Sequence, residues 1–364
     1  MSLFLSTERI SSSTPYAMHP LLVFWEATRA CDLACRHCRA CAQPRPHLDE
    51  LSTSEALALL EEIRDLQPKF LVVTGGDPLK RPDLLVLLSY ATKTLGLKVA
   101  LSPSATARFL RLGWRPLWEA GVTKASLSLD GPDQASHDRF RGVRGTWTRT
   151  MIAIEEAQDC GVSLQINTTL TRTLGQDFAA MRRTVERLRP SLWNLFALVK
   201  MGRATSDDLE SLLPWEMEKL LNDLAVIRQD VAFDVKTTEA PQFRRVVHQH
   251  YMRHGGRKKP MTQGAGDGRG VVFVSHTGEI FPSGFLPVVC GNIRQEGLTQ
   301  TYRNHSTFCA LRDSQALGGK CGTCEFRVLC GGSRARAHAT HGDYLAADPQ
   351  CPYESLNSQE AHDA

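Results

Sequence analysis

Hydrophobic runs long enough to cross a membrane are missing from this sequence. Its longest apolar stretches, such as residues 84–88, fall far short of the roughly 20 residues that a bilayer-spanning helix needs. The first residues, MSLFLSTERI, lack the basic start and the apolar core of a secretory signal. We therefore expect a cytoplasmic protein that has no membrane partner.

An excess of charge of one sign is missing as well. The 364 residues carry 43 basic and 39 acidic side chains, for a formal net charge of +4. Such a balance gives no reason to expect a nucleic-acid partner. Apolar residues make up 42% of the chain, which excludes a mostly disordered protein, and the length suits one large barrel-type domain with an appendage or two domains.

Cysteine, in contrast, is abundant and unevenly placed. Eight of the eleven cysteines form two groups near opposite ends of the chain, namely Cys31, Cys35, Cys38 and Cys41, and Cys321, Cys324, Cys330 and Cys351. In a chain without an export signal, clustered thiols bind metals more often than they pair as disulfides. The isolated Cys160, Cys290 and Cys309 are expected to be small buried hydrophobes.

Six runs with strand character alternate with helical patterns in the first 230 residues. Strands are expected at 21–26, 70–74, 98–102, 124–129, 163–169 and 192–198, and helices at 54–65, 82–95, 107–120, 148–160, 177–188 and 214–228. Ser52 followed by Glu55 is a capping-box signature for the first helix. This alternation predicts an α/β fold with a parallel sheet, either doubly wound or curved into a barrel, and with chemistry at the carboxyl ends of the strands.

The texture of the sequence changes near residue 240. Basic residues become frequent from 244 to 259, glycines cluster from 264 to 270, and a hairpin is expected between 271–274 and 279–281. The remaining tail is rich in loops and carries the second cysteine group. We therefore predict an N-terminal extension over 1–20, a barrel over 21–240 and a C-terminal, loop-rich auxiliary domain over 241–364.

The first cysteine group directly follows the first expected strand. Three thiolates on a short loop can bind three irons of a cubane cluster and leave the fourth iron open for a ligand. A structural zinc site with Cys41 as the fourth ligand is an alternative. A ferredoxin-type run would need a cysteine at position 45, which is Arg45, so that possibility fails.

The spacing CxxxCxxC after one strand, with Thr-Gly-Gly-Asp-Pro at the end of the next, resembles the radical SAM enzymes. The resemblance implies a partial (β/α)6 TIM-like barrel, and a 4Fe–4S cluster whose open iron is chelated by S-adenosylmethionine (SAM). It assigns the cluster to Cys31, Cys35 and Cys38, and the cofactor contacts at the second strand to Gly75, Gly76 and Asp77, the last replacing the glutamate common in the family. It also puts His37 where the family usually has an aromatic residue near adenine.

A second stretch, from Ser126 to Arg149, resembles the branch of this family that modifies peptides and tetrapyrroles. The resemblance implies contacts from Ser128 and Arg149 to the ribose and carboxylate of SAM. A guanidinium suits a carboxylate because its planar fork matches the two oxygens, although a solvated helix arginine is an equal alternative. Asn167, at the end of the fifth strand, is a further candidate for the cofactor or a plain turn residue.

The second cysteine group supplies four thiolates in the order C-x2-C-x5-C-x20-C. Four thiolates close either a zinc site or a 4Fe–4S cluster, and the spacing alone does not choose between them. Its position after a radical SAM-like core resembles the SPASM and twitch extensions, which implies an auxiliary 4Fe–4S cluster. The seven-cysteine SPASM pattern is absent unless Cys290 or Cys309 contributes. The spacing is similar to that of radical SAM enzymes of heme d1 and alternative heme biosynthesis.

The resemblance implies an oxidoreductase that reductively cleaves SAM to a 5′-deoxyadenosyl radical and then oxidises its substrate. Tetrapyrrole propionate side chains are the first candidate substrate, and a ribosomally made peptide or a small molecule such as an aminoglycoside is the alternative. A flavodoxin or ferredoxin would supply electrons. The non-enzymatic alternative is a two-site zinc-binding module.

Basic residues offer candidate sites for an anionic substrate. The cations from Arg244 to Lys259, with His248, His250 and His254, either bind tetrapyrrole carboxylates and the substrate metal or form a solvated loop. Arg203, after the sixth strand, is another anion-binding candidate. Arg334 and Arg336 would cover cluster charge.

Overall fold

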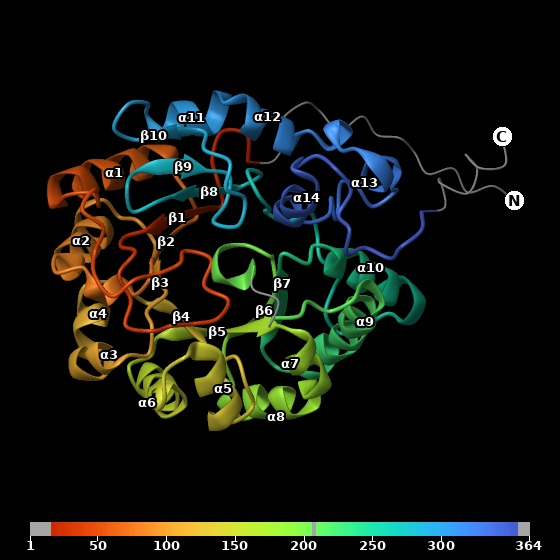
Figure 1. The fold of residues 1–364 in the computed structure, drawn as a ribbon, viewed down its shortest axis with the longest axis horizontal. Helices are drawn as coiled ribbons and strands as arrows, with labels where there is room; N and C mark the ends of the chain where they lie inside the picture. The colour runs from red at the N-terminus through yellow and green to blue at the C-terminus, as the bar shows by residue number, and fades with distance from the viewer. Residues whose placement is uncertain (1–15, 206–208, 356–364) are drawn as a thin grey trace, which may run out of the picture.

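A single ten-stranded sheet organises the computed structural model, which describes residues 16–205 and 209–355 (Figure 1). The strand order is β10-β9-β8-β1-β2-β3-β4-β5-β6-β7. The strands are β1 Leu22–Glu26, β2 Phe70–Thr74, β3 Val99–Leu101, β4 Lys124–Ser128, β5 Ser163–Leu170, β6 Leu192–Ala197, β7 Asp234–Thr238, β8 Val271–Val274, β9 Glu279–Phe281 and β10 Gly291–Asn292. β1 to β7 are parallel and adjacent in chain order, which is the arrangement of a partial barrel, because a doubly wound sheet reverses its order at a switch point.

Helices surround this sheet, so that the strands lie in the interior of the molecule (Figure 1). The barrel helices are α1 Thr53–Leu66, α2 Leu84–Ser89, α3 Ala107–Leu112, α4 Arg115–Glu119, α5 Gln134–Arg141, α6 Thr146–Asp159, α7 Arg172–Gln176, α8 Phe178–Leu188 and α9 Pro214–Asp230. The tail adds α10 Gln242–His254, α11 Leu298–Asn304, α12 Ser306–Arg312, α13 Gly319–Thr323 and α14 Arg334–His341. None of the described helices is both long and apolar enough to span a bilayer.

Alternation along each strand separates an apolar face from a polar one. The outward side chains, such as Trp25 and Leu127, are almost fully buried in one core with the helices. The opposite face carries hydroxyl and amide groups that contact one another across strands, as Asn194 Nδ2 does with Thr238 Oγ1 at 3.1 Å. The barrel interior is therefore polar, which suits a space that receives ligands.

The six expected barrel strands are confirmed within one or two residues at their ends, and so is the capping box of α1, where Ser52 accepts from the Glu55 amide. The expected helix over 82–95 ends as a π-helical turn, Tyr90–Thr94. The expected helix over 107–120 is two helices, because α3 ends at Gly113 with φ of 70°. α5 and β7 have no counterpart among the expected elements.

The tail returns to the barrel sheet. The expected hairpin is confirmed as β8 and β9, and β8 also pairs in parallel with β1, with Leu22 opposite Val271 and Trp25 opposite Val274. At the other edge, Ser333 and Arg336 contact Glu239, the residue after β7. The sequence boundary near residue 240 thus divides the chain but not the sheet. Residues 1–15 of the expected N-terminal extension lie outside the described residues.

Candidate functional site

The three cysteines of the first group lie on the loop that leaves the carboxyl end of β1. Cys31 and Cys35 are buried, Cys38 is half-buried, and all three are free thiols. Two backbone amides point at sulfur, because Leu33 N lies 3.3 Å from Cys31 Sγ and Ala42 N lies 3.4 Å from Cys38 Sγ. Amides that donate to sulfur stabilise the thiolate form that binds iron.

Burial, with smaller contributions from the Asp77 carboxylate and the Cys35 thiolate, raises the pKa of the Cys31 thiol to about 11. Burial also raises the pKa of Cys35, with an additional contribution from Cys38. Neighbouring thiols that oppose each other's ionisation need a cationic partner, and a bound metal centre deprotonates such thiols outright. The donor set therefore fits an iron cluster.

Arg203 donates hydrogen bonds to backbone carbonyls of this cysteine loop. Its Nε donates to Cys35 O at 2.8 Å, its Nη1 donates to Ala42 O at 3.0 Å, and its amide donates to Cys38 O at 3.0 Å. These contacts make Arg203 a clamp on the loop, and its role as an anion-binding residue stays a prediction. Gly202 belongs to the same clamp, since a Cβ there would lie 2.4 Å from Arg39 O.

A buried ion pair that the sequence did not reveal lies beside the same thiols. Arg141 Nη1 and Asp130 Oδ2 are 3.2 Å apart, and Asp130 Oδ1 accepts from Thr169 N at 2.7 Å. Burial lowers the pKa of Arg141, but Cys35, Asp130 and the other two thiolates raise it by more, so the guanidinium stays charged. Asp130 lies in the stretch from Ser126 to Arg149 that resembles the family, so the sequence drew attention to it. No sequence feature singled out Arg141.

His37 packs its ring against Phe140, with centroids 4.5 Å apart and planes 15° from parallel. Burial lowers the pKa of His37 to about 4, so the ring is neutral at physiological pH. Together with Phe140 it forms an aromatic surface beside the cysteine loop. The sequence predicted an aromatic role at this position, and the geometry is compatible with it.

The glycine pair at the end of β2 packs directly against the residues that precede Cys31. A Cβ at Gly75 would lie 2.5 Å from Thr28 O, and one at Gly76 would lie 2.4 Å from Ala30 O. The backbone bonds follow the same approach, with Gly76 N to Thr28 O at 2.8 Å. The two glycines thus allow the segment before Cys31 to pack closely against the end of β2.

Asp77 uses its carboxylate within the protein. It accepts from Leu79 N at 3.2 Å, from Ser104 N at 3.3 Å and from Thr106 Oγ1 at 3.1 Å. Burial raises its pKa to about 6, against the lowering effect of these donors. Ser104 Oγ in turn lies 3.9 Å from Cys31 Sγ. Asp77 therefore positions the loop after β3 beside the thiols. Because both of its carboxylate oxygens already accept hydrogen bonds from the protein, direct contact of this side chain with a cofactor is disfavoured.

The remaining predicted cofactor contacts lie around the same edge. Ser128 and Asn167 are paired in register at the carboxyl end of β4 and within β5, and both are half-buried on the polar face. Asn167 Oδ1 accepts from Gln165 Nε2 at 2.6 Å. Arg149, at the start of α6, donates to Ala105 O at 3.1 Å and to Arg144 O at 3.2 Å. Arg149 thus joins the loop beside Cys31 to α6, and its role toward SAM stays a prediction.

The last residues of the basic stretch lie at the opposite end of the sheet, whereas Arg245 lines the cavity of the second cysteine group. Arg257 Nη2 donates to Val231 O at 3.1 Å and Lys258 Nζ donates to Phe233 O at 2.5 Å. Both carbonyls come just before β7, at the amino ends of the parallel strands. Of the two alternatives for the basic stretch, these contacts favour a structural role for Arg257 and Lys258, because chemistry in such sheets lies at the carboxyl ends.

The four cysteines of the second group line one cavity. Its wall contains Cys321, Cys324, Cys330 and Cys351 with Gln242, Arg245, Lys320, Phe326, Arg327, Gly331, Gly332, Tyr353 and Ser355. Cys290 and Cys309 are not part of this wall. Cys290 is buried in the main core with its thiol 3.5 Å from Val288 O, whereas Cys309 is exposed.

Backbone amides also point at these thiols. Phe326 N lies 3.4 Å from Cys324 Sγ, Gly332 N lies 3.4 Å from Cys330 Sγ, and Asp348 N lies 3.4 Å from Cys321 Sγ. Burial, with smaller contributions from the Cys351 thiolate and the Asp348 carboxylate, raises the pKa of Cys330 to about 12. Four mutually opposed thiols around one space again fit a cationic metal centre.

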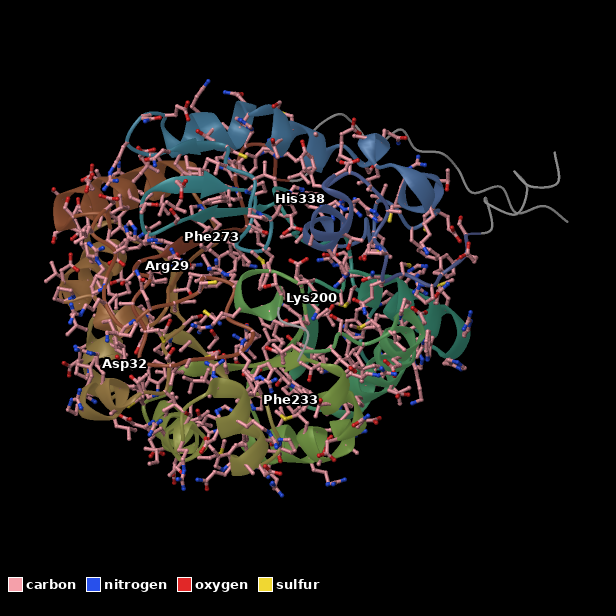
Figure 2. The ribbon with its side chains drawn as sticks, in the orientation of Figure 1. Arg29, Asp32, Lys200, Phe233, Phe273 and His338 are labelled. Carbon is pink, nitrogen blue, oxygen red and sulfur yellow. The ribbon has the colours of Figure 1, made fainter. Side chains whose placement is uncertain are left out.

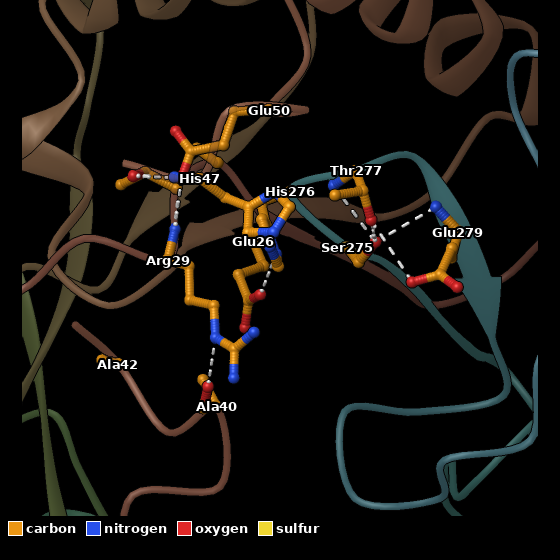
Figure 3. A network of polar contacts seen from close by, with 12 residues as sticks. Glu26, Arg29, Ala40, Ala42, His47, Glu50, Ser275, His276, Thr277 and Glu279 are labelled. Atoms are coloured by element: carbon orange, nitrogen blue, oxygen red, sulfur yellow. Dashed lines mark hydrogen bonds and ion pairs between the residues drawn. The ribbon is translucent and has the colours of Figure 1, made fainter. Parts of the chain in front are cut away.

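A polar network crosses from β1 to the turn after β8 (Figure 3). Glu26, the last residue of β1, contacts His276 Nδ1 at 2.8 Å and Arg39 Nη2 at 3.1 Å. Burial raises the pKa of Glu26, but Arg39 and His276 lower it by more, so the carboxylate is ionised. The Arg39 guanidinium also lies 4.4 Å from the centre of the Phe273 ring. Sequence reasoning missed this network because its members are far apart in the chain.

Aromatic side chains from the barrel and the tail meet near the carboxyl end of β6. The rings of Phe196 and Phe285 are 6.1 Å apart, and Phe285 packs against a small core that includes Val199 and Ala335. In Figure 2, Phe273, Arg29 and Lys200 are drawn over the centre of the ribbon, inside the ring of helices. The centre of the molecule therefore combines apolar rings with cations.

Single-ion metal sites find no support in this arrangement. Within residues 16–205 and 209–355, no three His, Cys, Asp or Glu side chains converge as the ligands of one metal ion do. A cubane cluster has a wider requirement, because each thiolate binds a separate iron atom.

Comparison with known proteins agrees with these observations. A family model described as "Radical SAM superfamily" matches residues 25–188. An AdoMet-dependent heme synthase of Nitratidesulfovibrio vulgaris is 38% identical over 340 residues, which cover 92% of each chain. A protein of the same name from Methanosarcina barkeri is 34% identical and covers 92% of this chain and 97% of its own.

The names of less similar relatives indicate other substrates. Mycofactocin maturase MftC of Mycobacterium ulcerans is 28% identical and covers 91% of this chain and 88% of its own. The fold is similar to the crystal structure of Streptococcus suis SuiB bound to S-adenosylmethionine, with a TM-score of 0.69 over 92% of this chain and 78% of that one. At 15% identity, the latter likeness concerns the fold alone.

Proposed function

The chain belongs to the radical SAM superfamily, and we propose that it is an AdoMet-dependent heme synthase that oxidises propionate side chains of an iron tetrapyrrole. One observation carries this proposal: identity of 38% to a heme synthase over 92% of both chains. The aligned length is too great for the barrel alone, so it includes most of the tail. A second cysteine group in the tail is the feature that an oxidative reaction needs.

Radical SAM enzymes use a 4Fe–4S cluster and SAM, and this chain has the residues to hold both. Cys31, Cys35 and Cys38 would hold the first cluster and leave one iron for SAM. When bound, these cofactors supply a radical that removes hydrogen from an unactivated carbon. The second group, Cys321, Cys324, Cys330 and Cys351, would hold an auxiliary cluster with no open iron.

The chain's own residues position this chemistry and keep water from it. Arg203 and Gly76 fix the cysteine loop against two different elements. The ion pair with Asp130 fixes the charged Arg141 guanidinium beside the thiols. Cys35 is buried and His37 is half-buried against Phe140, which limits the access of water to this side of the loop.

The barrel and the tail bring together groups that a tetrapyrrole would contact. Its planar macrocycle is complementary to aromatic rings such as Phe196 and Phe285, and its propionates are complementary to guanidinium groups. Arg39 has both properties, since it stacks on Phe273 and donates to a carboxylate. These contacts support a substrate that lies between the two cysteine groups.

Conversion of a propionate to a vinyl group removes one carbon dioxide, one hydrogen atom and one electron from the substrate carboxylate. The hydrogen atom is taken up by the fragment of SAM, whose cleavage consumes one electron. Electron input and output therefore balance, and no further oxidant is required. The first electron has to come from outside, and we propose a flavodoxin or ferredoxin as its source.

Mass spectrometry after anaerobic incubation tests the proposal. The holoprotein is mixed with SAM, a low-potential reductant and iron coproporphyrin III, with the metal-free porphyrin as a parallel sample. We expect products that have lost carbon dioxide and two hydrogens per converted propionate. SAM cleavage without any change in the porphyrin would overturn the heme synthase proposal and favour a peptide substrate, in line with the maturase relatives.

A further inference from the structure

Two half-buried arginines flank the first cysteine group, one just before it in the chain and one just after it. Arg29 Nε donates to Ala40 O at 2.7 Å, and Arg39 Nη2 donates to Glu26 Oε2 at 3.1 Å. Among the described residues, no group accepts from Nη1 or Nη2 of Arg29, or from Nε or Nη1 of Arg39. None of these nitrogens belongs to the fully buried polar atoms without a partner, so they reach accessible space. Both guanidinium groups therefore keep donors for a ligand.

The two guanidinium groups lie close to the same stretch of backbone. Ala40, whose carbonyl accepts from Arg29, is the residue that follows Arg39 in the chain. In Figure 3 the side chains of Arg29 and Glu26 point to the same side, toward Ala40, and Glu26 is the carboxylate that Arg39 contacts. The free donors of both arginines are thus gathered beside the carboxyl end of β1.

The tail fixes the orientation of the Arg39 guanidinium. Its Cζ lies 4.4 Å from the centre of the Phe273 ring. A Cβ at Gly284 would lie 3.0 Å from Arg39 Cζ and 3.2 Å from Phe273 Cδ2, so the backbone at Gly284 packs on both groups. A planar guanidinium fork held in this way is preorganised for the two oxygens of a carboxylate.

The carboxylates nearby are engaged elsewhere. Glu26 gives one oxygen to Arg39 Nη2 and the other to His276 Nδ1. Glu50 accepts from the backbone amide of Arg29 at 2.8 Å, and not from its guanidinium. Among the described residues, no carboxylate forms an ion pair with Arg29, and Glu26 occupies a single nitrogen of Arg39. The remaining donors are therefore open to a carboxylate that comes from outside the chain.

The position of these donors favours a substrate over the cofactor. β8 pairs with β1 on one side and β2 on the other, and Phe273, on which Arg39 stacks, belongs to β8. The predicted SAM contacts Gly75, Ser128 and Asn167 belong to β2, β4 and β5, on the other side of β1. The two arginines thus lie between the first cysteine group and the tail.

We propose that Arg29 and Arg39 bind the carboxylate of a substrate propionate that the reaction leaves unconverted. The inference rests on the tetrapyrrole substrate of the proposed function. Release of carbon dioxide removes the negative charge of a carboxylate, so guanidinium contacts that stabilise this charge would resist decarboxylation of the propionate they hold. At a retained propionate the same contacts orient the macrocycle without this penalty.

Absorbance titration of the anaerobic holoprotein with iron deuteroporphyrin IX tests the proposal. This porphyrin has hydrogen in place of the convertible propionates and keeps the others, and its dimethyl ester is the probe without carboxylates. We expect the wild type to bind the diacid more tightly than the diester. In Arg29→Gln and Arg39→Gln the Kd of the diacid should rise by about tenfold, whereas the Kd of the diester should stay within about twofold.

Arg45→Gln is the matched control, since Arg45 is an exposed arginine that follows the same cysteine group. Its Kd for the diacid should equal that of the wild type. An unchanged preference for the diacid in both Gln variants would overturn the inference. So would unchanged binding of the diacid together with a raised KM for SAM in porphyrin-free cleavage, which would assign the arginines to the cofactor.

If the Gln variants assemble no first cluster, Arg29→Lys and Arg39→Lys decide. Lysine keeps the charge but cannot form two parallel hydrogen bonds, so the Kd of the diacid should rise by about threefold, and a wild-type Kd would contradict the inference. A wild type that binds neither porphyrin would overturn the proposed function and the inference together. A preference for the diacid without conversion of iron coproporphyrin III would overturn the proposed reaction alone.

Discussion

The two cysteine groups differ in how the protein balances charge around them. At the first group, the guanidinium whose pKa responds to all three thiolates, Arg141, is paired with the buried Asp130. At the second group, the guanidinium that reaches sulfur is Arg334, whose Nη2 lies 3.7 Å from Cys321 Sγ and whose Nη1 donates to the backbone carbonyls of Tyr344 and Ala346. A balanced site suits a cluster that gives an electron to SAM, and a cationic site suits one that takes an electron.

The groups also differ in how the chain delivers their ligands. The first three thiols lie within eight residues of loop, which Arg203 and the β2 glycines fix from outside. The last four come from a span of about 30 residues and surround a cavity closed by α10 and the tail. A cluster that binds SAM requires three thiol ligands and one free iron, as the first group would provide. A cluster that only accepts an electron can have all four irons bound by thiols, as the second group would provide.

The largest effect should follow from removal of a thiol at the first group. Cys35→Ala should lower SAM cleavage by about a thousandfold or more, because the iron that binds SAM is lost with the cluster. Cys41→Ala is the control, since its loss leaves three ligands in place. The assay is chromatographic quantification of 5′-deoxyadenosine under reducing conditions. Equal loss in both variants would indicate that Cys41 is a fourth ligand and that the site is closed.

The buried ion pair should matter for stability more than any other polar contact at the first group. Asp130→Asn leaves Arg141 buried without its carboxylate and should lower the free energy of unfolding by about 3–5 kcal/mol. Asp130→Asn with Arg141→Met should recover part of this loss. Denaturant unfolding of the apoprotein measures both. A change below about 1 kcal/mol would show that the thiols, rather than Asp130, balance the guanidinium.

A histidine next to this pair should make stability depend on pH. The Asp130 amide donates to Nδ1 of buried His137, and burial lowers the pKa of His137 to about 4. The unfolded chain then binds more protons between pH 6.5 and 4, so stability falls as pH falls through that window, by about 3 kcal/mol in total. His137→Leu should remove this part of the slope in pH-dependent unfolding, and exposed His254→Leu should not. If the pH dependence of the unfolding free energy were unchanged in His137→Leu, a group other than His137 would be responsible for it.

The smallest effect is expected at the end of the basic stretch, residues 257–259, which contacts carbonyls just before β7. Lys258→Met removes a charge at the amino ends of the strands and should leave turnover and apparent substrate affinity unchanged within about twofold. Steady-state kinetics with the tetrapyrrole measures both values. A clear rise in KM would return the substrate to this end of the sheet.

Much of the barrel was predictable because its strands are buried and apolar, as in Phe70–Thr74, and are separated by helices with clear periodicity. β7 escaped prediction because only Val235 in its sequence is buried and its other residues are polar. The parallel pairing of β8 with β1 joins residues about 250 positions apart, and no local pattern encodes such a contact.

The site was predictable where chemistry fixes spacing and unpredictable where packing decides. Thiol spacing identified both cysteine groups. The clamp by Arg203 and the pairing of Arg141 depend on contacts between distant elements, so their sequences look like those of any solvated arginine. Within the basic stretch, Arg257 and Lys258 donate to carbonyls at the amino ends of the strands. The run of charges in the sequence did not indicate this structural role.

The division of labour between the two cysteine groups is tested most directly by Cys330→Ser in the holoprotein. SAM cleavage and tetrapyrrole oxidation are measured in the same anaerobic reaction, by chromatography and mass spectrometry. We predict that 5′-deoxyadenosine still forms while the decarboxylated product is lost. Product formation at the wild-type rate without an intact auxiliary cluster would contradict the account.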